Sequence, residues 1–168
     1  MAYRRWLVGL ALVGVMTGAG NGVAAAQAGP EAGPIWAQAG LGASSANFGG
    51  LAGVSVGAGG HLFSARASFV AENFEGGDEE SFDVALLYGR RLLTIGAFRP
   101  SASAGIAYVK CEECDDGGNA TSVGLAVSAE AALWPTKFAG VAVHGFGNLN
   151  SIASFAGVAL TIHLGRLR

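Results

Sequence analysis

The clearest pattern in the sequence is an alternation of large apolar residues with small or polar ones, as in "GVALTIHLG" near the C-terminus. Every second residue from Val158 to Leu164 is a large aliphatic one, while those between them are alanine, threonine and His163. A period of two is the repeat of a β-strand whose two faces meet different surroundings. The segment therefore predicts a strand, and its small, nearly uncharged second face is not that of a surface exposed to water.

The same alternation recurs along the chain and divides it into eight candidate strands of 9 to 13 residues. Strands that cross a bilayer at a tilt need roughly 9–11 residues, whereas strands of soluble proteins more often have about 5–6. An even number of strands is also expected of a bacterial up-and-down barrel. The candidate strands are 35–44, 51–59, 62–71, 81–89, 98–110, 122–134, 139–147 and 154–165.

The two faces of these strands predict which side contacts lipid. One face is aliphatic or aromatic and carries essentially no charge, while the other is Gly, Ala and Ser with a few ionisable groups. A soluble sandwich or barrel would place polar residues on its outer face and bulk inside. The pattern therefore predicts an all-β fold, an eight-stranded antiparallel up-and-down transmembrane β-barrel. Trp36 and Trp134 have inward parity, so we expect them to close a mouth of the barrel.

The connections between the strands predict the orientation of the barrel. We expect the first, third, fifth and seventh connections to be longer and external, as in outer-membrane barrels. These are 45–50, 72–80, 111–121 and 148–153, against 60–61, 90–97 and 135–138. We expect 90–97 to continue both neighbouring strands around a tighter turn.

Most acidic residues fall in two of the external connections. Solvated loops explain such acids by themselves, but the up-and-down order places all of them at one end of the barrel. They are Glu72, Glu75, Asp78, Glu79, Glu80, Glu112, Glu113, Asp115 and Asp116.

The N-terminal segment has the features of a secretory signal peptide. A positive region containing Arg4 and Arg5 precedes the apolar run "LVGLALVGVM" and then small residues ending in "VAAAQAG". We expect residues 1–26 to be the signal peptide, 27–34 a short linker and 35–168 the barrel domain. Cleavage would change the formal charge from −2 to −4, because it removes two arginines and no acid. Without a basic excess, nucleic-acid binding has no electrostatic basis.

The amino-acid composition is also consistent with a transmembrane β-barrel. The chain has 28 glycines, only 13% charged residues and a mean hydropathy of +0.43. The segment from about 35 to 168 resembles the small eight-stranded outer-membrane β-barrel proteins of the OmpX and OmpA membrane-domain type. This resemblance is architectural. It implies an outer-membrane location in a Gram-negative bacterium, contact with outer-membrane lipid, insertion by the barrel-assembly machinery, and a structural or surface-interaction role through the acidic external loops.

Several ionisable residues have interior parity and form a candidate polar cluster. A lone charge there would be unfavourable, so we expect ion pairs with a structural role. Arg99 and Glu130 lie on neighbouring strands and are the expected pair, with Arg66 able to reach across a narrow barrel. The cluster is Arg66, Asp83, Arg99, Glu130, His144 and His163.

No catalytic set is identified in the sequence. The segment "HGFGNLNS" from His144 to Ser151 invites comparison with lipid A deacylase barrels, which use a Ser-His-Glu set on the lipid-facing surface, but His144 has inward parity. The comparison fails at that position. An outer-membrane lipid-modifying enzyme is kept as one alternative. A secreted soluble β-barrel or sandwich that binds an apolar ligand is another.

The two cysteines form the motif "CEEC" in the third external connection. Export would place Cys111 and Cys114 in an oxidising compartment, where two nearby thiols form a disulfide. The motif lacks the second ligand pair of a zinc site, and the acidic loops lack calcium-loop spacing. We expect a disulfide, no metal site and no cofactor.

Overall fold

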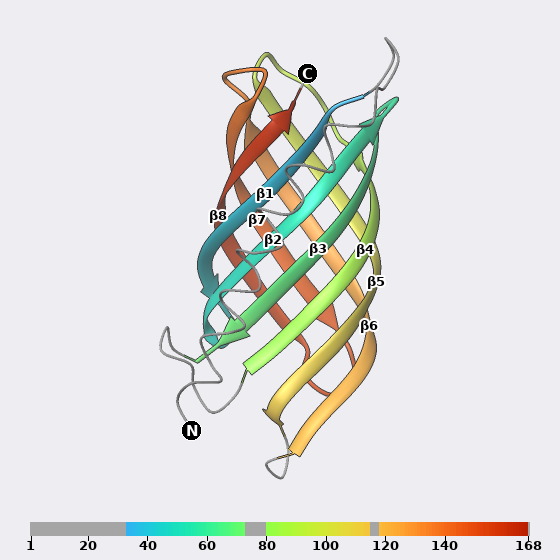
Figure 1. Ribbon diagram of the computed structural model, residues 1–168, viewed down its shortest axis with the longest axis vertical. Coiled ribbons are helices and arrows are strands. Elements are labelled where there is room, and N and C mark those ends of the chain that lie inside the picture. Colours follow the sequence, from blue (N-terminus) through green and yellow to red (C-terminus); the bar gives the residue numbers. More distant parts are fainter. Residues whose placement is uncertain (1–32, 73–79, 115–117, 168) are drawn as a thin grey trace. The chain divides into compact units, whose positions relative to one another are not determined.

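A computed structural model describes residues 33–72, 80–114 and 118–167. They form eight antiparallel strands that close into a barrel in the order β1 to β8, with β8 paired to β1 (Figure 1). Within the described part of the chain, no helix is long and apolar enough to cross a membrane. The strands are β1 Ile35–Ser44, β2 Asn47–Ala58, β3 His61–Ala71, β4 Glu80–Arg91, β5 Phe98–Cys114, β6 Gly118–Leu133, β7 Ala139–Leu149 and β8 Phe155–Arg166.

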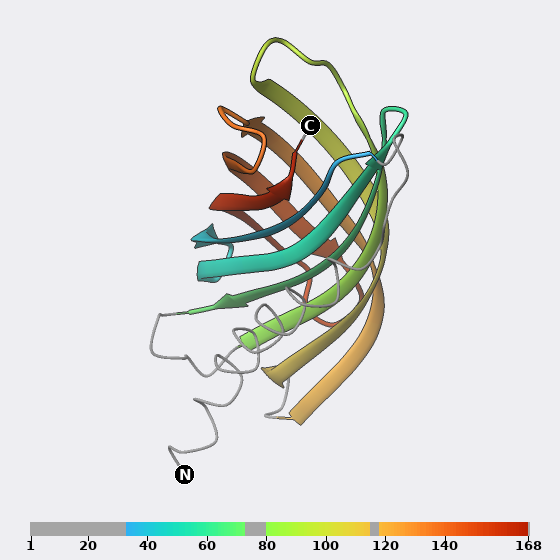
Figure 2. The ribbon, with the colours of Figure 1, turned by 45° about the horizontal axis from the view of Figure 1, so that its top comes forward.

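All eight strands and the closed antiparallel barrel are confirmed. Closure occurs between the first and last strands, where Ile35 pairs with Arg166 and Ser44 with Gly157. Because every strand has two neighbours, the sheet has no free edge with unpaired backbone groups. The beginning of β1 and the end of β8 lie at the same end of the barrel, the upper end in Figures 1 and 2. We call it the terminal end, and the other the distal end.

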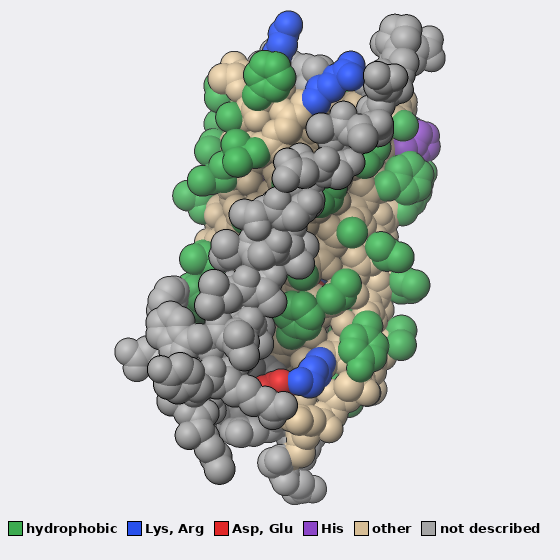
Figure 3. All heavy atoms as spheres, in the orientation of Figure 1, with side chains coloured by type: hydrophobic (Ala, Val, Ile, Leu, Met, Phe, Trp, Pro, Cys, Tyr) green, Lys and Arg blue, Asp and Glu red, His purple; other side chains and the backbone are tan. Residues whose placement is uncertain are grey.

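The assignment of the two faces is also confirmed. On β8, Leu160 and Ile162 have 66% and 58% of their surface exposed, whereas Thr161 and His163 are fully buried. Each of the eight strands contributes at least one exposed large hydrophobic side chain to the outer surface. In Figure 3, hydrophobic side chains extend over the wall of the barrel, and basic side chains stand at its upper end.

The expected difference in loop length between the two ends is wrong. The distal connections 45–46, 72–79, 115–117 and 150–154 are of similar length to the terminal connections 59–60, 92–97 and 134–138. The reason is that parts of the expected external loops extend the strands instead, so that Asn47 already pairs with Ser44 across a two-residue turn. Asn47 has a positive φ of 88°, a conformation that asparagine tolerates better than most residues.

Gly49 and Gly50 follow this turn and look like loop residues in the sequence, but they belong to β2. A Cβ atom at Gly50 would lie 2.7 Å from the Phe69 ring and 2.8 Å from the Leu41 side chain. The glycine is therefore needed for close packing of neighbouring side chains and not for a turn.

The connection between β4 and β5 also differs from the expected tight turn. β4 continues only to Arg91, and 92–97 remain a six-residue connection. Ile95 and Phe98 form an isolated bridge within it. Leu92 and Ile95 are 64% and 67% exposed, so the terminal end carries apolar side chains beyond the strands.

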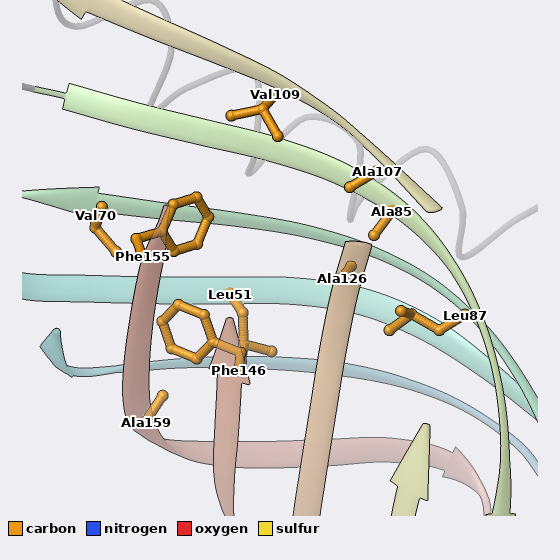
Figure 4. Close-up of a cluster of buried hydrophobic side chains, with 10 residues drawn as sticks. All are labelled: Leu51, Val70, Ala85, Leu87, Ala107, Val109, Ala126, Phe146, Phe155 and Ala159. Carbon is orange, nitrogen blue, oxygen red and sulfur yellow. The ribbon is translucent and has the colours of Figure 1, made fainter. Parts of the chain in front are cut away.

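Two hydrophobic clusters fill parts of the interior. The first lies in the distal half and brings together side chains from β2 to β8, among them Phe146 and Phe155 (Figure 4). The second lies at the terminal end, where Trp36, Trp134 and Leu167 are almost fully buried. The Trp36 and Trp134 rings pack edge to face with centroids 5.0 Å apart. These indoles therefore lie inside the barrel, as their parity predicts.

Candidate functional site in the barrel interior

A buried ion pair joins β3 and β4 inside the barrel. Arg66 Nη2 lies 3.0 Å from Asp83 Oδ2, and both side chains are completely buried. Asp83 also accepts hydrogen bonds from the Ser68 backbone N–H at 3.2 Å and from Asn148 Nδ2 at 2.8 Å. The Ser68 hydroxyl donates to it as well. A buried carboxylate is tolerated when a cation and several donors surround it, and Asp83 has both.

The other side of the Arg66 guanidinium reaches across the lumen to β6 and β7. Nη1 donates to Val127 O at 2.8 Å and to Ser128 Oγ at 2.7 Å. Nη2 donates to Gly147 O at 3.3 Å. Arg66 therefore ties one wall of the barrel to the opposite wall, which a narrow eight-stranded barrel permits.

A second group of ionisable side chains surrounds Glu130. Glu130 on β6 lies directly opposite His144 on β7, and its Oε2 is 3.4 Å from His144 Nδ1. The same oxygen is 3.4 Å from His163 Nε2 on β8. The side chains of all three residues are at most 7% exposed.

Hydrogen bonds extend this second group in both directions. Ser128 Oγ lies 3.2 Å from His144 Nε2, which links the group to Arg66. On the other side, Trp134 Nε1 donates to His163 Nδ1 at 3.3 Å. One network thus runs through the barrel interior from Asp83 to Trp134.

The expected pairing of Arg99 with Glu130 is not what the structure shows. Among the described residues, the Arg, Lys or His nitrogen atoms within 4.0 Å of the Glu130 carboxylate belong to the two histidines. Arg99 is partly exposed near the terminal end, where its guanidinium lies 5.3 Å from the centre of the Trp134 ring and donates to Thr94 Oγ1 at 3.2 Å. The two residues are on adjacent strands but not at opposite positions, because the register places Arg99 opposite Ala132 and Glu130 opposite Ser101.

The structure places the five other predicted interior residues in this network, which are Arg66, Asp83, Glu130, His144 and His163. Sequence reasoning missed Ser128, Asn148 and Trp134 as members. The available signal was parity, because Ser128 lies two residues before Glu130 on the same face of β6. The sequence alone does not distinguish an inward uncharged polar side chain that joins the hydrogen-bond network from one that only packs the barrel interior.

A small cavity opens beside Glu130. Its volume is about 10 Å³, room for one water-sized particle. Apart from Leu62 and Leu87, every side chain that lines it is polar. The polar lining residues are Gln38, Ser55, Ser64, Ser101, Ser103, Ser128, Glu130 and His144.

The cysteine motif lies at the distal end of the barrel, where β5 ends and β6 begins. Cys111 is buried and disulfide-bonded, and the Ser81 hydroxyl donates to its sulfur at 3.3 Å. The register of β5 against β6 shifts between Cys111 and Cys114. The side chain of Cys114 is not described, so its role as the disulfide partner of Cys111 stays a prediction.

Most of the acidic loop residues lie outside the described residues. Only the side chains of Glu72 and Glu112 are described, and both residues are exposed at the distal end. Glu112 forms an exposed ion pair with Lys110, a type of contact that contributes little to stability. The side chains of Glu75, Asp78, Glu79, Glu80, Glu113, Asp115 and Asp116 are not described.

Comparison with known proteins gives a fold and no family. No protein-family model matches the chain, and no curated protein matches it. The crystal structure of Neisserial surface protein A (NspA) superimposes with a TM-score of 0.57 at 12% identity, covering 79% of this chain and 94% of that one. A structure described as a de novo designed transmembrane β-barrel gives a TM-score of 0.49 at 12% identity, covering 79% and 97%. The superposition on NspA therefore supports the fold, an eight-stranded closed antiparallel β-barrel.

Proposed function

We propose that this chain is a small outer-membrane β-barrel with a structural or surface-interaction role. Its strands contact lipid, and the connections of the distal end, with their acidic residues, form the surface that meets partners outside the cell. The lipid of the outer membrane and the barrel-assembly machinery are the partners that every such barrel needs. Gram-negative bacteria have the membrane that this function requires.

The outer surface of the strands is the observation that carries the proposal. All eight strands contribute exposed large aliphatic or aromatic side chains to it, while Arg66, Asp83 and Glu130 are buried inside. A soluble protein rarely exposes one continuous apolar surface of this kind. In a bilayer the same surface is favourable, and the closed sheet leaves no backbone group without a partner.

Membrane fractionation tests the location. The full chain, expressed with its N-terminal segment in a bacterium with two membranes, should be recovered with the outer membrane. It should also migrate differently on a gel with and without heating. A monomer that stays soluble without detergent would contradict the proposal and favour a secreted barrel instead.

The two shortest connections allow a matched test of orientation. The turn at 45–46 lies at the distal end and the turn at 59–60 at the terminal end, and each has two residues. An epitope inserted at 45–46 should be labelled on intact cells, whereas the same epitope at 59–60 should be labelled only after lysis. The reverse result would place the terminal end outside.

A hydrolase is the second candidate, and a specific geometry favours it. Ser128, His144 and Glu130 follow one another at 3.2 Å and 3.4 Å, the order of nucleophile, base and orienting acid in serine hydrolases. All three face a cavity of about 10 Å³ inside the barrel and not the lipid, which weighs against a lipid substrate. Labelling of the folded barrel by a fluorophosphonate probe, lost in Ser128→Ala, would establish the hydrolase.

A further inference from the structure

Charge is distributed unevenly between the two ends of the barrel. At the terminal end, the described strand ends and connections contain five Lys and Arg residues and neither Asp nor Glu. The described acids lie at the distal end or, like Asp83 and Glu130, inside the barrel. Basic side chains stand accordingly at the upper end in Figure 3. The five basic residues of the terminal end are Arg90, Arg91, Arg99, Lys137 and Arg166.

Two of these residues end rows of lipid-facing side chains. Arg90 follows Tyr88 on the outer face of β4, and Arg166 follows Leu164 on the outer face of β8. Both arginines are exposed, and so is Lys137. Within the described part of the chain, none of these three basic side chains forms an ion pair. Their charges therefore lie where the apolar outer surface ends, and they are available to a partner of opposite charge.

Exposed apolar side chains lie among these charges. In the two longer connections of the terminal end, Ile95 and Phe138 are 67% and 70% exposed. Ile95 exchanges two backbone hydrogen bonds with Phe98, at 2.9 and 3.1 Å, and the Phe138 N–H donates to Thr136 Oγ1 at 3.2 Å. These bonds hold the two connections in place with their apolar side chains outward. Apolar surface exposed in this way marks contact with a membrane or a protein.

An aromatic side chain accompanies the basic side chains in both places. His61 lies directly opposite Arg90 in the register of β3 and β4, and its Nδ1 is 2.6 Å from the Tyr88 hydroxyl oxygen. Lys137 is followed in the chain by the exposed ring of Phe138. Aromatic side chains gather at the level of lipid headgroups in membrane proteins. The terminal end therefore combines the side chains that suit a headgroup layer.

Anionic phospholipid is the partner that fits both kinds of side chain. Its phosphate groups attract Lys and Arg side chains near the membrane surface, and the layer just below them accepts apolar side chains. A second copy of the chain fits less well, because copies in one membrane share an orientation and would bring like charges together at this end. An acidic soluble protein would match the charge, but it would not explain why Arg90 and Arg166 continue lipid-facing rows.

We propose that the terminal end of the barrel binds anionic phospholipid headgroups through Arg90, Lys137 and Arg166. In the proposed orientation these headgroups belong to the inner leaflet of the membrane, while the acidic distal end faces outward. The inference rests on the proposed membrane location and names the class of lipid that one end of the barrel selects. It does not depend on the role of the external loops.

Spin-labelled lipids measure this selectivity. The exported protein is reconstituted in phosphatidylcholine vesicles with a trace of spin-labelled phosphatidylglycerol or phosphatidylcholine, and electron paramagnetic resonance gives the fraction of each label held at the protein surface. The protein should prefer phosphatidylglycerol at least about twofold. The preference should fall in high salt, which screens exposed charges. Equal association of the two lipids with the unchanged protein would overturn the proposal.

Two lysines at opposite ends of the barrel provide matched variants. Lys137→Gln should lower the preference, whereas Lys110→Gln should leave it unchanged, because the Lys110 side chain, 43% exposed, lies at the distal end. Adding Arg90→Gln and Arg166→Gln to Lys137→Gln should abolish the preference. If this triple variant does not fold, the two lysine variants decide. An unchanged preference in Lys137→Gln and in the folded triple variant would overturn the proposal.

Two further outcomes separate this inference from its alternatives. Binding of polyglutamate by the protein in neutral vesicles, without a preference for phosphatidylglycerol, would overturn the proposal and make an acidic protein the partner. A barrel that enters vesicles but does not select phosphatidylglycerol contradicts this inference alone. A chain that enters no vesicle contradicts both this inference and the membrane location.

Discussion

Arg66 on β3 and Asp83 on β4 meet at 3.0 Å inside the barrel, with no exposed side-chain surface on either residue. Their strands are neighbours, but the residues are not directly opposite, because Arg66 pairs with Ala85 and Asp83 with Ser68. The ion pair is therefore diagonal, and the free side of the guanidinium remains available for Ser128 and Gly147 on the opposite wall.

Removal of Asp83 should destabilise the barrel strongly. Asp83→Ala leaves the Arg66 charge buried without its partner, and we expect a loss of about 3–5 kcal/mol in the free energy of unfolding. Reversible urea unfolding in detergent micelles measures this. The double variant with Arg66→Met should recover part of the loss, since no charge then remains unpaired. A double variant as unstable as the sum of both single variants would show that the two side chains are not coupled.

The effects of Arg99 and Glu130 should be independent. Arg99 contacts Thr94 and the Trp134 ring, whereas the Glu130 carboxylate faces the two histidines. In a double-mutant cycle with Arg99→Gln and Glu130→Gln, the two changes in unfolding free energy should add within about 0.5 kcal/mol. A larger coupling energy would contradict this expectation and support an ion pair between Arg99 and Glu130.

Charge on the outer surface should be tolerated only near the ends of the strands. Leu160→Arg, in the middle of β8, should cost roughly 2–4 kcal/mol in lipid vesicles if this position is near the bilayer centre. Leu92→Arg is the matched control, because both leucines are about equally exposed, at 66% and 64%, and Leu92 lies in an end connection. Its effect should be about 1 kcal/mol or less. Similar losses for the two variants would contradict the membrane-embedded orientation of the barrel.

The disulfide should be intact in the exported protein and contribute only modestly to stability. Mass spectrometry after alkylation without reduction should find no modified thiol at Cys111 or Cys114. The bond closes a very short loop, and the chain-entropy contribution of a disulfide increases with loop length. Cys111→Ser with Cys114→Ser should therefore lower the unfolding midpoint slightly and leave the barrel intact. Two alkylated thiols in the exported chain would refute the pairing.

Strand number and the orientation of side chains could be predicted from the sequence, and the reason is local. In a strand, neighbouring side chains point to opposite faces, so an alternation such as that of Leu160, Thr161 and Ile162 determines which side is apolar without any knowledge of the partner strands. The eight strands and the inward placement of His163 follow from this period of two. The lengths of the connections did not follow, because the Gly49–Gly50 pair, which resembles a loop, is a strand segment packed against Phe69 and Leu41.

The contacts inside the lumen were decided only by the tertiary structure. Barrel closure and strand tilt bring together residues far apart in the chain, such as Arg66 and Gly147, which are 81 positions apart. Parity states that Arg66, Ser128 and Glu130 all point inward, but it does not say at which height each one lies along the barrel axis. The register between strands sets that height, and it places Glu130 opposite His144 and not beside Arg99. Which interior charges pair is therefore a property of the closed barrel and not of any single strand.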